Sequence, residues 1–352
     1  MYFSPEPKYR REDLFDREKE LNELDRIFNV GSKIVLVTGI RRIGKTSLVS
    51  VYLNERKKTF ALADLRGSSN SFQALYEMFS EIINQIDKKE MIRTLLSKIS
   101  GVQIGEFGIS LSWKRGQRVE LVKLIDAIDE IGKEVMIAID EAQKLRGALS
   151  NLFLEILAHC YDYCKNVKFV LTGSEAGLLH SLLRINDPES PLYGRFLPEL
   201  RLFPFSRDES KKFLSEGLKQ YKIPFNENLI ELAFEYLDGI VGWLNELGLR
   251  CVLKGEINEE IIREVFNSAV KLQISEISHY SPNYSLILEA IGKGYNTWSE
   301  MKKYISMKFK RTLLDSELFR YINNLKMRDY IYEQDNEYYI GDPILRKYFS
   351  SS

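Results

Sequence analysis

The chain alternates short, continuously apolar segments with longer segments in which apolar residues recur at helical spacing. Short apolar runs are typical of buried strands, whereas the longer spacing is typical of helices that bury one face. The apolar runs predict strands at residues 33–38, 59–64, 135–139, 167–171 and 199–202. Because helical segments separate these runs, we expect an α/β domain built on a parallel sheet.

The same spacing predicts helices at residues 15–28, from 46 onward, at 71–86 and at 117–131. Asp16 is expected to cap the first helix, because its carboxylate can accept hydrogen bonds from free backbone N–H groups. Residues 102–113 alternate around glycines, which predicts a β-hairpin inserted in the domain. Residues 1–14 contain prolines and are expected to form an irregular arm.

From residue 206 the pattern changes to helices alone, expected at 206–221, 227–238, 242–254 and 258–277. Ser206 and Glu209 have the spacing of a capping box at the start of the first of these helices. Later helices, at 284–292, 298–307 and 315–327, precede a strand pair at 330–332 and 338–340. This order predicts a winged helix-turn-helix. We therefore expect an α/β core at 1–205, an all-α lid at 206–278 and a winged helix at 279–352.

The segment Gly39-Ile40-Arg41-Arg42-Ile43-Gly44-Lys45-Thr46 is a complete phosphate-loop motif, followed by Ser47, between a predicted strand and a predicted helix. Its glycines let backbone N–H groups approach phosphate oxygens, and the helix directs the positive end of its dipole at the same anion. Lys45 is expected to reach the β- and γ-phosphates, and Thr46 to place its hydroxyl on Mg²⁺. The sequence therefore predicts a nucleotide-binding site.

An acidic pair, Asp140 and Glu141, ends the third predicted strand. Ligands of open α/β sheets bind at the carboxyl ends of strands, so this pair should lie opposite the phosphate loop. Asp140 is expected to hold Mg²⁺ through water, and Glu141 to orient and activate the attacking water. Thr172 and Ser174 end the next strand, where a hydroxyl either lies between the acidic pair and the γ-phosphate or caps the following helix.

Composition sets limits on the remaining chemistry. The 352 residues are 44% hydrophobic and 28% charged, with fifty basic and fifty acidic residues, so overall charge attracts neither nucleic acid nor membrane. Cys160 and Cys164 lie beside His159, but three donors without a fourth make buried thiols a better interpretation than a metal site. Few cysteines and no long apolar segment favour a cytoplasmic protein without a membrane anchor.

As a set, the motifs resemble the archaeal ATPase branch of AAA+ proteins, which is close to the STAND NTPases. The similar features are the phosphate loop with two arginines, the preceding Phe15-Asp16-Arg17-Glu18-Lys19-Glu20-Leu21, the acidic pair with Gln143, and Thr172-Gly173-Ser174. The resemblance implies a five-stranded core with a helical lid, binding ATP or ADP with Mg²⁺.

The resemblance also implies roles for single residues. Phe15, Arg17 and Glu18 would contact the adenine, and Thr172 or Ser174 would be the first nucleotide sensor. Arg195 would be an arginine finger acting on a neighbouring subunit, with a structural ion pair as the alternative. In the lid, Trp243 stands where such proteins usually carry the proline of a nucleotide sensor.

Two functions fit these features: a slow ATPase whose lid and winged helix move with the γ-phosphate, and a tight nucleotide-binding protein with little turnover. Glu141 favours the first, because a purely structural site needs no base, and a nucleotide kinase is disfavoured by the helical lid and the large C-terminal region.

The winged helix has two candidate partners, duplex DNA and protein. Residues 280–352 hold eleven basic and nine acidic residues, a small excess for a DNA reader. The basic residues Lys302, Lys303, Lys308, Lys310 and Arg311 would allow weak contact with duplex DNA. A protein surface, either a partner or the chain's own core, is the preferred interpretation.

Overall fold

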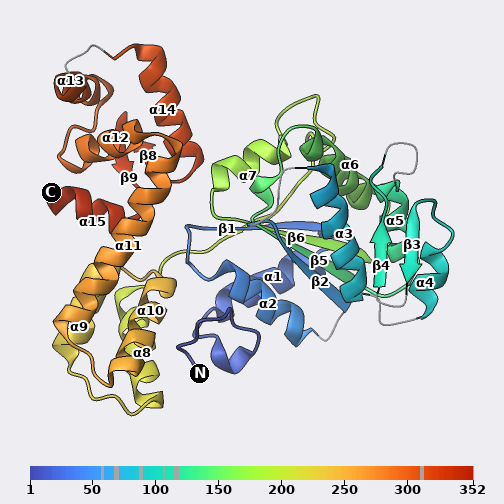
Figure 1. Ribbon diagram of the computed structural model, residues 1–352, viewed down its shortest axis with the longest axis horizontal. Coiled ribbons are helices and arrows are strands. Elements are labelled where there is room, and N and C mark those ends of the chain that lie inside the picture. The colour runs from blue at the N-terminus through green and yellow to red at the C-terminus, as the bar shows by residue number, and fades with distance from the viewer. Residues whose placement is uncertain are drawn as a thin grey trace.

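The computed structural model describes residues 1–56, 59–66, 71–86, 90–105, 108–114, 119–309 and 313–351 (Figure 1). An α/β core lies at one end of the molecule, and the helices of the second half of the chain gather at the other end. The long helix α11 (Glu259–Tyr280) runs through this second group and connects its two parts. Within the described ranges, no helix is long and apolar enough to cross a membrane.

The core is a five-stranded parallel sheet in the order β2-β5-β6-β1-β7. Its strands are β1 (Ile34–Thr38), β2 (Thr59–Asp64), β5 (Val135–Asp140), β6 (Val167–Gly173) and β7 (Glu199–Arg201). Every residue of β1 and β5 is buried, as expected for central strands that are covered on both faces. The predicted α/β class with a parallel sheet is confirmed.

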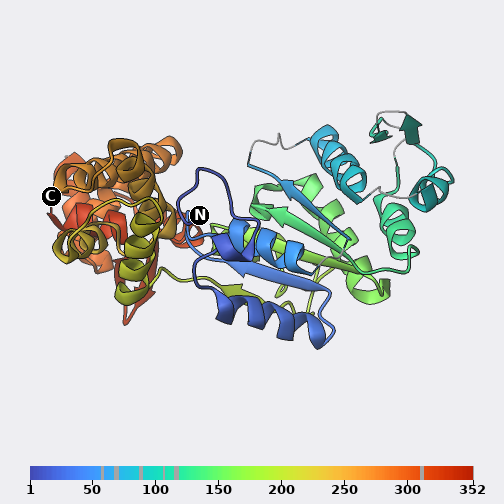
Figure 2. The ribbon, with the colours of Figure 1, turned by 90° about the horizontal axis from the view of Figure 1, so that it is seen from below.

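Helices cover both faces of this sheet (Figure 2). One face packs against α1 (Glu18–Asn29) and α2 (Lys45–Glu55). The other face packs against α3 (Phe72–Ile86), α5 (Leu121–Asp129), α6 (Ala148–Tyr163) and α7 (Ala176–Leu183). These helices cover the faces of the sheet, and the lid and the winged helix lie beyond the carboxyl ends of its strands.

The predicted start of α1 is wrong. The helix begins at Glu18, and its N-cap is Arg17, which makes no side-chain cap within the described structure. Asp16 and Arg17 have φ values of 55° and 75°. Two successive left-handed residues turn the backbone away from the helix path, so Asp16 lies outside the helix and does not cap it.

The predicted hairpin is confirmed as the antiparallel pair β3 (Val102–Gly105) and β4 (Gly108–Leu111). Asn84 of α3 fastens it, because its amide accepts from the N–H of Ile109 at 2.8 Å and donates to the carbonyl of Ile109 at 3.0 Å. The short helix α4 (Glu90–Leu96) precedes the hairpin and was not expected from the sequence. The expected start of the next helix, Gln117, lies outside the described residues.

Helices α8 (Arg207–Gln220), α9 (Glu227–Leu237), α10 (Val241–Lys254) and α11 form a second hydrophobic core. The capping box at the start of α8 is confirmed: Ser206 accepts from the N–H of Glu209, whose carboxylate accepts in return from the N–H of Ser206 at 2.7 Å.

The winged helix has a third core. Its elements are α12 (Pro282–Gly292), α13 (Trp298–Phe309), α14 (Asp315–Met327), β8 (Ile331–Gln334), β9 (Glu337–Ile340) and α15 (Pro343–Ser351). The predicted helices and strand pair are present, and β8 pairs with β9 antiparallel. Helix α15 was not expected from the sequence, and it packs against α11 and α12.

The N-terminal arm is irregular as predicted, apart from the 3₁₀ turn η1 (Arg11–Asp13), but it is firmly packed. Phe3 is 2% exposed and lies between Gly217 of α8 and Gly248 of α10. A Cβ atom built at either glycine would lie 2.2 to 2.4 Å from the Phe3 ring, so only glycine leaves room for it. Farther along, the N–H of Lys8 donates to Ser47 Oγ at 3.1 Å. The arm thus ties two lid helices to the helix that follows the phosphate loop.

Candidate nucleotide site

The phosphate loop connects the end of β1 to the start of α2. Gly39 has a φ of 139°, and a Cβ built on it would lie 2.6 Å from the carbonyl oxygen of Leu202. Gly44 has a φ of 97°, which is also in the region that favours glycine. Both glycines of the motif are therefore required by the backbone path as well as by the approach of a phosphate.

Lys45 lies inside the loop with 5% of its surface exposed. Its ammonium donates to the carbonyls of Gly39 at 2.8 Å and Ile40 at 3.1 Å. Burial lowers the pKa of Lys45 to about 8, while the charges of Glu141 and Asp140 act in the opposite direction. A desolvated ammonium in this position fits a phosphate anion, whose negative charge would raise the pKa of Lys45 again.

Thr46 and Asp140 meet opposite the loop. The hydroxyl of Thr46 donates to Asp140 Oδ2 at 2.8 Å, and the hydroxyl of Thr172 donates to Asp140 Oδ1. Asp140 is 2% exposed. A hydroxyl and a carboxylate are hard oxygen donors, and Mg²⁺ is commonly held by one or two carboxylates together with substrate phosphates. This donor set fits Mg²⁺, with Thr46 and Asp140 as the residues that would hold it.

Glu141 begins the 3₁₀ turn η2 (Ala142–Lys144) in a left-handed conformation, with φ 57°. Its Oε2 accepts from Gln143 Nε2 at 2.5 Å and from the hydroxyl of Ser174 at 2.7 Å, and its N–H donates to Thr172 Oγ1 at 3.2 Å. Thr172 and Ser174 therefore contact the acidic pair. Gln143 was noted in the motif, but its contact with Glu141 was not foreseen.

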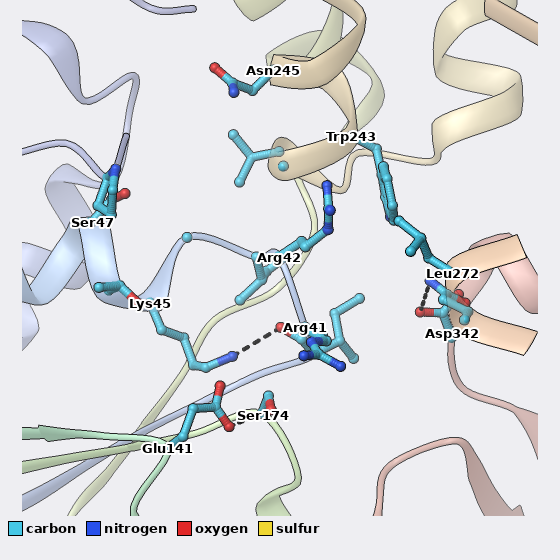
Figure 3. A pocket seen from close by; sticks show the side chains of 18 of the residues that line it. Arg41, Arg42, Lys45, Ser47, Glu141, Ser174, Trp243, Asn245, Leu272 and Asp342 are labelled. Carbon is cyan, nitrogen blue, oxygen red and sulfur yellow. Dashed lines mark hydrogen bonds between the residues drawn. The ribbon is translucent and has the colours of Figure 1, made fainter. Parts of the chain in front are cut away.

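These groups line one cavity of about 990 Å³. Its wall also includes residues 4–8 of the arm, residues 241–243 at the start of α10, several residues of α11, and residues 328–330 of the winged helix. Figure 3 shows Lys45 and Glu141 directed into the same space from α2 and from the end of β5. Parts of the chain far apart in sequence thus enclose the phosphate loop.

The comparisons with known proteins agree with this geometry. A family model described as an ATPase domain predominantly from Archaea matches residues 14–247. The chain belongs to this family. A second family model, the C-terminal winged helix-turn-helix domain of MCM proteins, matches residues 279–340. The resemblance to archaeal ATPases of the AAA+ class is therefore confirmed.

Solved structures show the same arrangement over almost the whole chain. The Walker-type ATPase PABY2304 of Pyrococcus abyssi is 34% identical, with 99% of both chains covered and a TM-score of 0.82. Two structures share the fold at low identity. Cdc6p from Pyrobaculum aerophilum is 16% identical, with 99% and 97% of the chains covered and a TM-score of 0.55. The ORC2 protein of Aeropyrum pernix is 15% identical, with 99% and 95% covered and a TM-score of 0.64.

Among curated proteins, the uncharacterized protein MJECL04 of Methanocaldococcus jannaschii is 24% identical, and the match covers 95% of this chain and 67% of that protein.

The helices that follow the α/β core contact the phosphate loop directly. Arg42 lies beside Trp243 (Figure 3), and its guanidinium is 3.7 Å from the centre of the Trp243 ring. Arg42 also pairs with Glu246 at 3.1 Å. The N–H of Gly242 donates to the carbonyl of Arg42 at 2.9 Å. Trp243, the lid residue noted in the sequence, therefore stacks on a loop arginine.

The segment expected to contact adenine is only partly at the cavity. Phe15 and Arg17 line it, whereas Glu18 is not among the described residues that do and pairs instead with Arg11. Phe15 packs edge-on against Phe205, with ring centres 5.6 Å apart. Arg17 is 7% exposed and donates to the carbonyl of Phe203 at 2.9 Å. The arm residues 4–8 were not foreseen as cavity residues, since nothing in their pattern indicates the contact.

Arg195 lies away from the cavity. Its guanidinium pairs with Asp162 at 2.5 Å and donates to the carbonyl of Pro191. The neighbouring side chains of Tyr193 and Phe196 are 53% and 74% exposed. Arg195 therefore makes an intramolecular ion pair, which was the alternative considered for it. Its action on a neighbouring subunit stays a prediction.

The winged helix contacts the α/β core at the start of α7. Arg328 pairs with Glu175 at 2.8 Å, and its guanidinium lies 3.6 Å from the centre of the Tyr280 ring. Asp329 Oδ2 accepts from the N–H of Ala176, the first residue of α7, at 2.6 Å. Burial raises the pKa of Glu175 and that of Asp329. The winged helix therefore contacts the chain's own core through the residues that directly follow Ser174.

The cysteines are buried, as expected. Asp126 adds a possible donor, since its carboxylate, His159 and Cys164 offer ligand atoms within 4.8 Å of one another. However, His159 Nε2 and Asp126 Oδ1 are 2.6 Å apart, which is a hydrogen-bond distance. Two ligands of one zinc ion, each about 2 Å from the metal in a tetrahedral site, lie farther apart than this. The pair is therefore interpreted as a hydrogen bond.

Proposed function

We propose that this protein is a Mg²⁺-dependent ATPase that hydrolyses ATP slowly and uses the bound nucleotide to set the positions of its lid and winged helix. The observation that carries the proposal is the shared cavity. The phosphate loop, the metal-type pair Thr46 and Asp140, and Glu141 face side chains of the lid and the winged helix across it.

Glu141 is the residue suited to act as the base. Its carboxylate is nearly buried and is oriented by Gln143 and Ser174, so one oxygen has fixed partners. A carboxylate held this way can orient a water molecule and accept its proton. Mg²⁺, when bound by Thr46 and Asp140, would neutralise charge on the phosphates. Lys45 would supply a positive charge at the same phosphates.

The coupling to the winged helix runs through adjacent residues. Ser174 bonds Glu141, and the next residue, Glu175, pairs with Arg328. A change at the γ-phosphate that moves Ser174 therefore acts on the docking contact of the winged helix. A nucleotide can shift this docking only if it interacts differently with the docked and released states, and the γ-phosphate supplies that difference.

The test is ATP turnover by the full chain. Glu141→Gln should bind ATP but lose turnover roughly a hundredfold or more, and Lys45→Ala should lose nucleotide binding. Glu12→Gln, which changes an exposed acid on the arm, is the matched control and should behave as the unmodified protein. Wild-type turnover in Glu141→Gln would contradict the assignment of the base.

The coupling has its own readout, the hydrogen exchange of the Ala176 amide, which Asp329 protects in this structure. ATP and ADP should give different exchange rates at this amide. Equal rates with both nucleotides would contradict the switch, even if the protein hydrolyses ATP.

The alternative function is a tight nucleotide-binding protein with little turnover. Enclosure of the cavity by the arm, the lid and the winged helix favours slow release of a ligand, which supports this alternative. Both functions predict bound nucleotide, but only the first predicts that Glu141→Gln changes the rate at which phosphate appears.

The winged helix is proposed to act mainly through protein contacts. Of its basic residues, Lys302 pairs with Asp315 at 2.9 Å and Lys308 with Glu289 at 3.3 Å, while Lys310 and Arg311 lie outside the described residues. Paired lysines offer less charge to phosphates. Fluorescence anisotropy with a random duplex at low salt should therefore show weak, salt-sensitive binding, and tight sequence-selective binding would contradict this preference.

A further inference from the structure

Several arginines line the nucleotide cavity, and three of them make contacts between the α/β core and the lid or the winged helix. Arg41 pairs with Glu276, Arg42 stacks on Trp243, and Arg328 pairs with Glu175. Arg66 is different, because its ion-pair partners are Asp64 and Asp140, the last residues of two sheet strands. It stands just beyond the carboxyl end of β2, the neighbour of β5.

The backbone fixes the position of Arg66. Asp64, the last residue of β2, is in register with Asp140 of β5. The ladder continues by one more bond, from the N–H of Leu65 to the carbonyl of Asp140 at 3.1 Å, and the side chain of Leu65 is buried in the core. Arg66 therefore directly follows a residue, Leu65, whose position beside the acidic pair is fixed.

The side chain of Arg66 points back at that pair. Its Nε donates to Asp64 Oδ2 at 2.7 Å, and Nη2 lies 2.6 Å from the same oxygen. Nη2 also lies 3.6 Å from Asp140 Oδ2, the oxygen that accepts from Thr46. The guanidinium is about half exposed and lines the cavity that contains Lys45 and Glu141. It is thus within reach of the place where Mg²⁺ and the terminal phosphate would lie.

We propose that Arg66 is a catalytic arginine supplied by the chain to its own nucleotide, contacting the γ-phosphoryl group as negative charge develops on it. The inference rests on the proposed ATPase function and names a residue that acts in it. In the reaction, water attacks the γ-phosphorus and the bond to the β–γ bridging oxygen breaks. ADP and phosphate leave, and Glu141 takes the proton of the water. Arg66 forms no covalent bond; it stabilises charge.

Asp64 is the positioning residue in this proposal. It holds the guanidinium through two nitrogen atoms, which limits the side chain to a small range of directions. A bound phosphate competes with Asp140 for the outer nitrogen, while Asp64 keeps its hold on Nε. Arginine suits this position better than lysine, because its planar group can contact a carboxylate and a phosphate at once.

The first experiment measures binding without turnover. Calorimetry measures the affinities for Mg·ATP and Mg·ADP of two proteins. One carries Glu141→Gln alone, and the other carries Glu141→Gln together with Arg66→Ala. We expect Arg66→Ala to weaken Mg·ATP binding about tenfold or more and to leave Mg·ADP binding within about threefold, because only ATP carries the γ-phosphate. An equal change in both affinities overturns the proposal, and so do unchanged affinities together with wild-type turnover.

The second experiment measures single turnover over a range of protein concentrations. Arg66→Ala should be slower by about a thousandfold, the lower end of the range for a catalytic arginine, and by the same factor at every concentration. Arg66→Lys should recover part of the rate, and Asp64→Asn should lie between wild type and Arg66→Ala. Arg26→Ala, which removes an exposed arginine paired with Glu23, is the matched control.

The two failures are distinguishable. If the wild type itself releases no phosphate, the ATPase proposal fails, but the difference between Mg·ATP and Mg·ADP affinities still tests Arg66. If the wild type turns over and Arg66→Ala keeps wild-type turnover and affinities, only the role of Arg66 is refuted. Melting curves establish whether each variant is folded. If Arg66→Ala does not fold, Arg66→Lys replaces it in both experiments.

Discussion

The ion pair between Glu175 and Arg328 should hold the winged helix against the ATPase core. Glu175 Oε2 and Arg328 Nη1 are 2.8 Å apart, and the two side chains are only 9% and 12% exposed. Removing one partner of a buried pair commonly costs about 3–5 kcal/mol, since it leaves the other charge buried and unpaired. The stacking of Arg328 on Tyr280 adds about 0.5–2 kcal/mol.

The free-energy cost of the unpaired charge can be relieved if the winged helix leaves the core. A lone Glu175 becomes hydrated if the winged helix moves away, so Arg328→Gln should release the winged helix before it unfolds the core. The burial that raises the pKa of Glu175 shows that this carboxylate gains from becoming hydrated. Gly177 supports the same contact, because a Cβ built there would lie 2.7 Å from Cα of Met327.

The assay is native-state hydrogen exchange at the Ala176 amide, measured for wild type, Glu175→Gln, Arg328→Gln and the double variant. Each single variant should speed exchange of this amide by at least tenfold. The exchange rate of the double variant should be closer to that of each single variant than the sum of the two free-energy effects predicts. A coupling of about 1–3 kcal/mol is expected for residues in contact. Additive effects within about 0.5 kcal/mol would refute the assignment of this pair as the docking contact, and Lys326→Gln, which breaks an exposed pair with Glu333, is the control.

Further predictions concern separate parts of the molecule. Phe3→Ala should loosen the arm by about 3–5 kcal/mol, because the ring is almost fully buried; limited proteolysis of residues 1–14 measures this, with exposed Tyr9→Ala as control. Burial raises the pKa of Asp342 to about 6 from 3.8, so the folded state binds more protons between these values. Stability should therefore fall as pH rises from about 4 to 6, by on the order of 3 kcal/mol. In urea unfolding, the stability of Asp342→Asn should lack this pH dependence. The same pH profile in the variant and the wild type would contradict the role of Asp342. Turnover per subunit should rise with protein concentration, and Arg195→Ala should abolish that rise; concentration-independent turnover would leave Arg195 as the ion-pair partner of Asp162.

The parts of the fold that were predictable are those decided by neighbouring residues. The capping box of Ser206 and Glu209, the strand–loop–helix of the phosphate loop and the hairpin at residues 102–113 each depend on a few adjacent side chains. The same holds for Asp140 and Glu141, whose place at the end of a buried strand follows from the apolar run before them. Local patterns therefore predict the residues at the centre of the site.

The parts that were missed depend on contacts between distant segments. Phe3 meets α8 and α10 more than two hundred residues later, and only the structure shows why Gly217 and Gly248 are needed there. Asp16 has a good capping side chain, but its left-handed backbone removes it from the helix. Arg66 follows an ordinary short strand, and its nearness to Asp140 depends on the strand order of the sheet.

Charge pairing in the cavity provides a route by which a bound nucleotide would act on the lid. Arg41 and Arg42 of the phosphate loop are held by Glu276 of α11 and Glu246 of α10. A bound polyphosphate brings several negative charges to the same loop and competes with these carboxylates for the two arginines. ATP carries more charge than ADP, and Lys45 would place the additional charge close to the loop. The two nucleotides would therefore weaken the lid contacts to different extents, which is the difference in interaction energy that a switch requires.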